Sequence, residues 1–257
     1  MSKHNALQMF GRSGNPALND ATFRNENRVI GQVMTLQGTV NKTGLLLGIL
    51  VLTALYTWNL FFQSGNNPAA VMPIAIGGAI GGFVMALVTI FKKTWSPITA
   101  PIYAALEGLF LGGISAIFES QYPGIVIQAT GLTLGTLASL LVLYKLGIIK
   151  PTENFRLMIV SATMGIGVLY LISMIMNMFG STGIGFIHSN GLFGIGFSLF
   201  VVAIAALNLV LDFDFIEQGS EMGAPKYMEW FGAFSLMVTL IWLYLEMLRL
   251  LAKLRSR

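Results

Sequence analysis

The stretch that decides the fold of this chain is GLFGIGFSLFVVAIAALNLVLDFD, residues 191–214. Before Asp212 it carries no charged side chain for about 20 residues, which is long enough for a helix to cross the roughly 30 Å hydrocarbon core of a bilayer. The whole chain has the same character, with 55% hydrophobic residues, only 10% charged residues and a mean hydropathy of +0.74. A soluble domain of 257 residues needs a more charged surface. We therefore predict an all-α integral membrane protein.

Seven apolar segments are predicted to cross the membrane as one helical bundle. They are residues 44–62, 71–91, 98–118, 124–144, 157–179, 191–214 and 229–250. Short connections rich in turn-forming residues, such as Tyr122-Pro123-Gly124, join them and leave no room for a second folded domain. The chain is thus predicted to consist of a polar cytoplasmic tail, 1–43, and a seven-helix transmembrane domain, 44–257.

The distribution of Lys and Arg predicts the orientation of the bundle. These residues fall in the N-terminal tail and in the alternate loops 92–97, 145–156 and 215–228. The loops 63–70, 119–123 and 180–190 hold none. By the positive-inside rule the N-terminus is cytoplasmic.

The basic C-terminal end contradicts that rule if all seven segments cross. It holds Arg249, Lys253, Arg255 and Arg257. Either the last segment is re-entrant, or the earlier loops dominate and the C-terminal end is an exception. Seven crossings are favoured because 229–250 is long enough to span the bilayer.

Glycines in the predicted spans indicate close helix packing, because small residues let backbones approach each other in lipid. Close packing is expected at Gly77, Gly78, Gly81, Gly82, Gly108, Gly112, Gly165, Gly167, Gly194 and Gly196.

No motif predicts an enzyme or a tightly bound cofactor. The chain has no cysteine, which excludes a thiolate metal site. Ser198 lies in a Gly-Phe-Ser sequence, but the two histidines, His4 and His188, lie in the tail and in an outer loop. A serine nucleophile needs a base within reach. The basic residues cluster beside the spans, where topology explains them, so nucleic acid is not an expected partner.

Four acidic residues lie in or at the edge of the spans: Glu107, Asp212, Asp214 and Glu246. An ionisable group in a span costs a few kcal/mol and usually lines a cavity or finds a partner. Residues two apart on a helix point about 200° from each other. Because Asn208 precedes Asp212 by one turn, we expect Asp212 and Asn208 to face inward and Asp214 to face the interface.

Each acid also has a structural alternative. Lys92 and Lys93 could be salt-bridge partners of the aspartates, and Arg249 lies on the same helical face as Glu246. Glu107 could be protonated or bonded by a neighbouring hydroxyl. If instead the inward acids act together, they lie at successive depths, as in a route for a cation or a proton.

Several stretches resemble the Bax inhibitor-1/YccA family, also called the transmembrane Bax inhibitor motif family. The most specific are PIYAALEGLFLGGISAIFE (101–119), AALNLVLDFDFIEQG (205–219) and EWFGAFSLMVTLIWLYLEMLRLLAKLRSR (229–257). The chain looks most similar to a bacterial branch with a longer polar tail. The resemblance implies a multi-pass protein of the bacterial inner membrane, with seven helices and the last helix central. It also implies a pH-sensitive calcium leak or, as in YccA relatives, modulation of an ATP-dependent membrane protease.

The resemblance further implies a pH sensor made of two carboxylates on the sixth and seventh helices. The family pattern falls on Asp212, followed by Ile216, and on Glu246 in Leu243-Tyr244-Leu245-Glu246. Glutamate there replaces the family's aspartate, and Glu107 is a further acid outside the pattern. Two such carboxylates can share a proton. As hard oxygen ligands they could also bind a passing calcium ion, with Ca²⁺ the permeant ion and not a resident cofactor.

Two functional hypotheses therefore remain. One is a cation leak channel gated by protonation of these carboxylates. The other is a regulator that binds a membrane protease through its polar tail, in which case the acids are structural.

Overall fold

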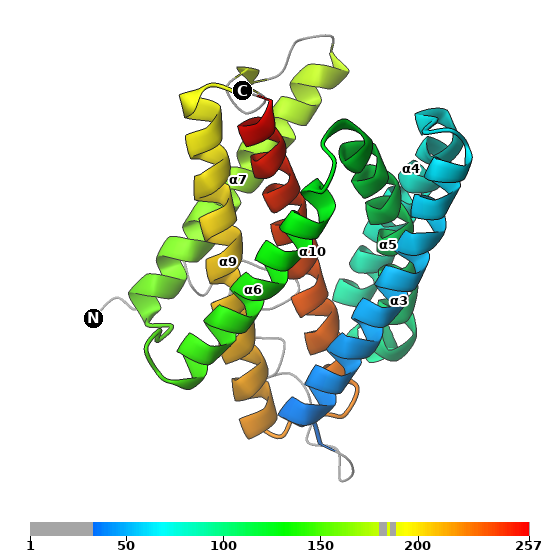
Figure 1. The fold of residues 1–257 in the computed structure, drawn as a ribbon. Helices are drawn as coiled ribbons and strands as arrows, with labels where there is room; N and C mark the ends of the chain where they lie inside the picture. The colour runs from blue at the N-terminus through cyan, green and yellow to red at the C-terminus, as the bar shows by residue number, and fades with distance from the viewer. Residues whose placement is uncertain (1–32, 180–183, 186–188, 257) are drawn as a thin grey trace. The chain divides into compact units, whose positions relative to one another are not determined.

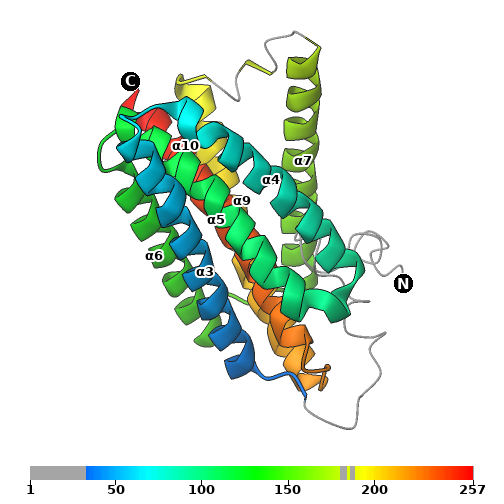
Figure 2. The same cartoon turned by 90° about the vertical axis from the view of Figure 1, so that its right-hand side faces the viewer.

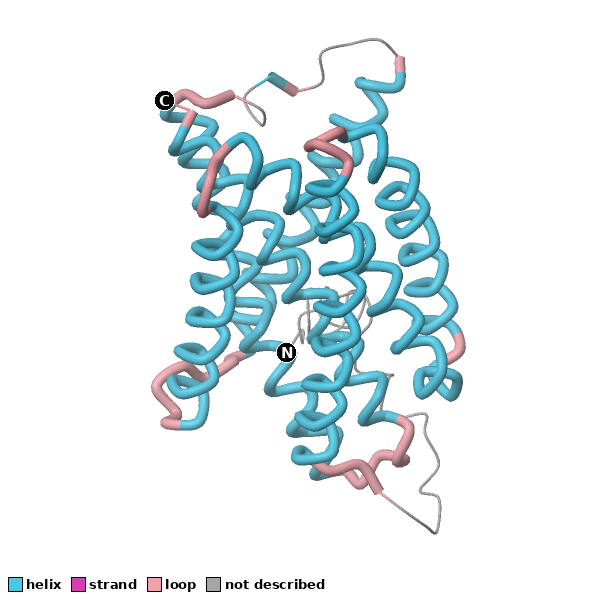
Figure 3. The backbone as a smooth tube through the Cα atoms, turned by 45° about the vertical axis from the view of Figure 1, so that its right-hand side comes forward, coloured by secondary structure: helices cyan, strands magenta, loops and turns pink. Residues whose placement is uncertain are grey.

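Seven long helices make up most of the chain in the computed structural model, which describes residues 33–179, 184–185 and 189–256. They are α3 (Leu36–Gln63), α4 (Pro68–Phe91), α5 (Ser96–Gln121), α6 (Ile125–Lys145), α7 (Glu153–Met178), α9 (Leu192–Glu221) and α10 (Met228–Arg255), with a 3₁₀ turn η1 (Lys93–Trp95) before α5 (Figure 1). Each long helix has the length and apolarity to cross a membrane. Figure 3 shows helices joined by loops, with no strand in the described part. The predicted seven-helix membrane bundle is confirmed.

The sixth helix continues further than the sequence predicted. The expected loop 215–228 begins only after Glu221, because Phe215 and Ile216 are buried and continue the apolar side of α9. The chain turns at Gly223, whose φ of +69° suits glycine and few other residues. Asp212 and Asp214 therefore lie within a helix and not at its end.

Backbone contacts divide the chain into two compact parts. Of the described residues, we call 33–126 and 216–238 the α3–α5 part, after its complete helices, and those within 127–215 and 239–256 the α6–α9 part. Each part is described by itself.

In the α3–α5 part, α5 lies between α3 and α4 (Figure 2). A Cβ atom added at Gly112 would lie 2.1 Å from the carbonyl oxygen of Ala54 on α3. On the other side of α5, a Cβ added at Gly78 of α4 would lie 2.6 Å from the carbonyl oxygen of Leu106. The Thr57 hydroxyl donates to the Leu109 carbonyl at 3.0 Å across the α3–α5 contact. Glycine thus lets these backbones approach, as predicted.

Close helix packing was also predicted at other glycines, and at four of them the prediction is wrong. Beta carbons added at Gly77, Gly165, Gly167 and Gly196 would meet nothing within 4 Å. These glycines face open space, so the four-residue spacing alone does not identify a packed face.

The segment before α3 is fixed to the loop between α9 and α10. The Met34 amide donates to the Ala224 carbonyl at 2.7 Å, and Val33 forms an isolated antiparallel bridge with Pro225. Met34 is buried, at 1% exposure. Thr35 then caps α3, its side chain accepting from the Gly38 amide.

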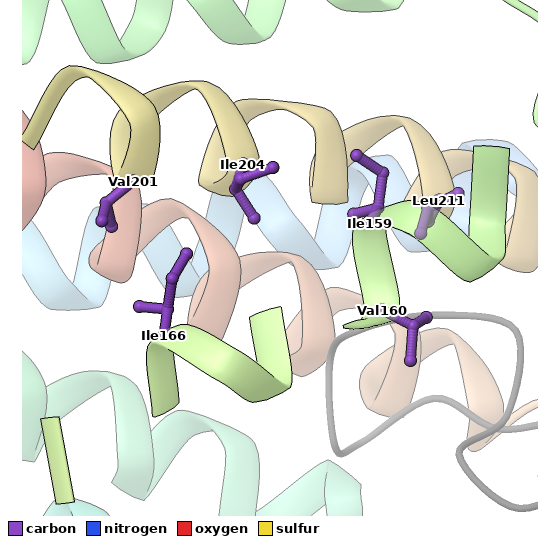
Figure 4. Close-up of a cluster of buried hydrophobic side chains, with 6 residues drawn as sticks. All are labelled: Ile159, Val160, Ile166, Val201, Ile204 and Leu211. Carbon is purple, nitrogen blue, oxygen red and sulfur yellow. The ribbon is translucent and has the colours of Figure 1, made fainter. Parts of the chain in front are cut away.

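In the α6–α9 part, α7 and α9 pack through an aliphatic cluster (Figure 4). Its members are Ile159, Val160, Ile166, Val201, Ile204 and Leu211. α10 is the most buried helix: 78% of its most apolar window is buried, against 17% for α3 and for α6. α10 runs unbroken from Met228 to Arg255, which is long enough to cross a membrane.

Gly112→Ala should destabilise the protein by about 1–3 kcal/mol, because the added methyl group meets the α3 backbone and forces the helices apart. Gly77→Ala is the matched control, with open space at its Cβ, and should leave stability unchanged or raise it by up to about 1 kcal/mol. Thermal unfolding in one detergent checks both. Equal melting temperatures for the two variants would show that the α3–α5 contact is not tight.

Candidate functional site

One face of α10 carries a row of buried polar side chains. Thr239, Glu246 and Lys253 follow each other at intervals of seven residues, which is about two turns and about 10 Å along a helix. They are only 2%, 1% and 5% exposed, respectively. We call the surface where this row meets α9 and α7 the polar seam.

Two hydrogen-bonded contacts fix how α9 runs along the seam. The Thr239 hydroxyl lies 2.5 Å from an Asp212 carboxylate oxygen, and the Lys253 ammonium donates to the Ser198 hydroxyl at 2.8 Å. Lys253 follows Thr239 on α10 by the same number of residues by which Ser198 precedes Asp212 on α9. The two helices are therefore antiparallel in constant register, and Glu246 faces the level of Ala205.

Asp212 is fully buried, at 0% exposure. Asn208, one turn before it, is buried too and donates to the Thr163 hydroxyl on α7 at 2.8 Å and to the Ile204 carbonyl at 2.9 Å. The inward direction expected for both side chains is what the structure shows. The Asn208 side-chain oxygen is buried and has no hydrogen-bond donor among the described residues.

Glu246 is held by two partners. One of its oxygens accepts from the Tyr170 hydroxyl at 3.0 Å and from the Arg249 guanidinium at 2.7 Å. Arg249 also donates to the Tyr170 hydroxyl at 2.8 Å. The ion pair considered as the structural alternative for Glu246 therefore exists. The second Glu246 oxygen is buried and, within the described ranges, receives no hydrogen bond.

Asp212 and Glu246 do not form a shared carboxylate site. Asp212 accepts a hydrogen bond from Thr239, whereas Glu246 lies seven residues, about 10 Å, further along α10 and accepts from Tyr170 and Arg249. Calcium binds oxygen at 2.3–2.6 Å, so one ion cannot take both carboxylates as ligands in this arrangement. No group of three metal-binding side chains occurs among the described residues. The paired calcium ligands implied by the resemblance are therefore not supported.

Asp214 lies outside the seam, as expected. It forms an ion pair with Arg156, and the Tyr144 hydroxyl lies 3.5 Å from its other oxygen. Arg156 was predicted to lie in a loop, but α7 begins at Glu153 and includes it. Of the two lysines considered as partners, Lys92 is exposed at the end of α4, and the Lys93 ammonium lies 6.0 Å from the centre of the Phe231 ring.

Glu107 belongs to the α3–α5 part. It is partly buried on α5 and packs against Gly82 of α4, where an added Cβ would lie 2.6 Å from its carboxylate. Glycine at position 82 makes the space that this side chain occupies.

Sequence reasoning missed a third buried acid, Glu229, in the first turn of α10. Its fully buried carboxylate accepts from the Thr35 amide at 2.9 Å, from the Thr35 hydroxyl at 2.8 Å and from Lys226 at 2.7 Å. It also forms an ion pair with Lys42. A carboxylate at a helix N-terminus is favourable. The only local signal was the three-residue spacing of Lys226 and Glu229.

Sequence comparison now bears on this geometry. Residues 15–256 match the family described as Bax inhibitor 1 like. The chain belongs to the Bax inhibitor 1-like family. No curated protein and no solved structure matches it. The family expected from the resemblance is thereby confirmed, while the bacterial branch stays a prediction.

Arg249→Met should destabilise this Bax inhibitor 1-like protein by about 1–3 kcal/mol, because Glu246 loses its charged donor while staying buried. The double variant Arg249→Met/Glu246→Leu should recover most of the loss, since it removes both charges together. Melting temperatures in detergent measure both effects. Arg255→Met, which removes an exposed bond to Gln128, is the control and should change little. A double variant no more stable than Arg249→Met would contradict the assignment.

Proposed function

We propose that this protein is a pH-sensitive cation leak channel, with calcium among the permeant ions, and that the polar seam is its gate. The proposal rests on family membership and on one observation in particular. Asp212, a carboxylate with no exposure, lies in the seam one turn from Asn208, whose side-chain oxygen has no hydrogen-bond donor among the described residues. A second such oxygen, on Glu246, lies further along the seam. Buried acceptors without a donor are sites where water or a cation binds favourably.

Protonation of Asp212 is the proposed switch. A neutral carboxyl bonded to Thr239 suits a closed interface between α9 and α10. An ionised carboxylate at zero exposure costs several kcal/mol unless water or a cation reaches it. Ionisation therefore favours a hydrated seam, and the leak rises as pH rises.

The other end of the seam limits the current. Arg249 and Lys253 place two positive charges there, and Lys253 fills the space beside the Gly194 carbonyl at 3.0 Å. Fixed positive charges repel a passing cation. The proposal is therefore a slow leak and not a high-throughput pore.

We also propose a bacterial inner membrane location with a cytoplasmic N-terminus. The Lys and Arg of the loops support it. The basic C-terminal end weighs less against it than the sequence suggested, because Arg249, Lys253 and Arg255 bind Glu246, Ser198 and Gln128, respectively.

The role is proposed to be non-enzymatic. The base beside Ser198 is Lys253, and both side chains are buried, so a substrate has no access to them as the helices now lie. His4 and His188 lie outside the described residues. The protease-regulator hypothesis also depends on the N-terminal tail, of which residues 1–32 lie outside that description.

Asp212→Asn should abolish the pH dependence of calcium flux into liposomes that hold the purified full-length protein. The amide keeps the size and hydrogen bonding of the neutral acid but cannot ionise. Wild type should leak more at high pH, by up to about tenfold per pH unit. The variant should stay low and flat from pH 6 to 8. Glu153→Gln, at an exposed acid in the first turn of α7, is the control and should behave like wild type.

Two outcomes would change this conclusion. Flux in Asp212→Asn that still follows pH would place the gate elsewhere. No flux from wild type at any pH would favour the regulator hypothesis, which capture of the membrane protease by the intact protein would then support.

A further inference from the structure

A compact group of charged residues lies where α3 and α10 begin. We call Thr35, Lys42, Lys226 and Glu229 the Glu229 cluster. Lys42 and Lys226 bond to different oxygens of the one carboxylate, Oε2 and Oε1. The two ammonium groups are therefore close neighbours, and the cluster keeps one positive charge in excess.

The negative and positive groups of the cluster differ in exposure to solvent. The Glu229 side chain is 0% exposed, whereas those of Lys42 and Lys226 are 18% and 42% exposed. The negative charge is thus hidden, and the positive groups face outward. Because the buried carboxylate holds both lysines in place, they are already oriented for a further anion.

Aromatic rings and a third lysine surround the cluster. The Lys42 ammonium lies 5.5 Å from the centre of the Trp230 ring, and that of Lys93 lies 6.0 Å from the centre of the Phe231 ring. Three lysines therefore gather around the first turn of α10, in the α3–α5 part of the chain.

Apolar surface adjoins these charges. Leu36 and Val40 are exposed one turn apart on α3, and Trp95 and Ile98 are exposed beside Lys93. Lysine and tryptophan next to exposed aliphatic side chains are typical of the level where lipid headgroups meet acyl chains.

We propose that the Glu229 cluster, together with Lys93, binds the headgroup of an anionic phospholipid. The phosphate group lies against Lys42 and Lys226, and the acyl chains follow the exposed apolar face of α3. A zwitterionic headgroup fits less well, because its own cation meets the excess positive charge. This site is separate from the polar seam and does not depend on the leak function.

The test uses the full-length protein in vesicles of phosphatidylcholine or phosphatidylglycerol with brominated acyl chains, which quench nearby tryptophans. Trp95 and Trp230 report on the site. Wild type should prefer phosphatidylglycerol. Lys93→Gln/Lys226→Gln should reduce that preference by about fivefold for each lysine removed. Lys42 remains in this variant to pair with Glu229.

The matched control is Lys145→Gln/Lys150→Gln, which removes the same charge from two exposed lysines, one at the end of α6 and one in the loop after it. Its preference should stay within about twofold of wild type, given that only lysines near the bound lipid contribute. An equal loss in both double variants would show a general attraction to the membrane and overturn the site. An unchanged preference in Lys93→Gln/Lys226→Gln would overturn it as well.

A single variant and a competition experiment complete the test. If Lys93→Gln/Lys226→Gln does not fold, Lys93→Gln alone leaves the contacts of Glu229 intact and should still lose about fivefold. Inorganic phosphate at constant ionic strength should not displace the lipid. Displacement would identify a site for a free anion instead.

Discussion

A polar side chain buried among membrane helices has no water to bond, so it must find its partner on another helix. On α10 this constraint acts on Thr239, Glu246 and Lys253, and it sets the register of the helix. A shift of α10 by one turn would separate these side chains from their partners. The polar bonds do not allow such a shift, because Asp212 and Ser198 each lie at one level of α9 only.

The same bonds give the seam two chemically different ends. Asp212 with Thr239 is acidic and can change charge, whereas Lys253 with Ser198 is basic and filled by the protein's own ammonium group. Glu246 lies between them and is already paired with Arg249. In the proposed function, Asp212 senses pH at one end of this interface and the basic residues at the other end limit the current.

The sequence predicted the seven helices and the inward direction of Asp212, because apolar run length and helical spacing are local properties. It could not separate Gly77 from Gly78, since neighbouring glycines share the same spacing pattern while only one faces α5. Arg156 with Asp214, and Lys42 with Glu229, join residues far apart in the chain, which local patterns do not reveal. The extension of α9 was missed because three acids near its end suggested a loop.

The backbone bond between Met34 and Ala224 has a mechanical consequence. Met34, just before α3, is bonded to the loop that joins α9 to α10. A load on the tail therefore acts on that loop before it acts on α3. Because the loop connects the two helices that carry the seam, tension at the N-terminus is transmitted to both of them at once.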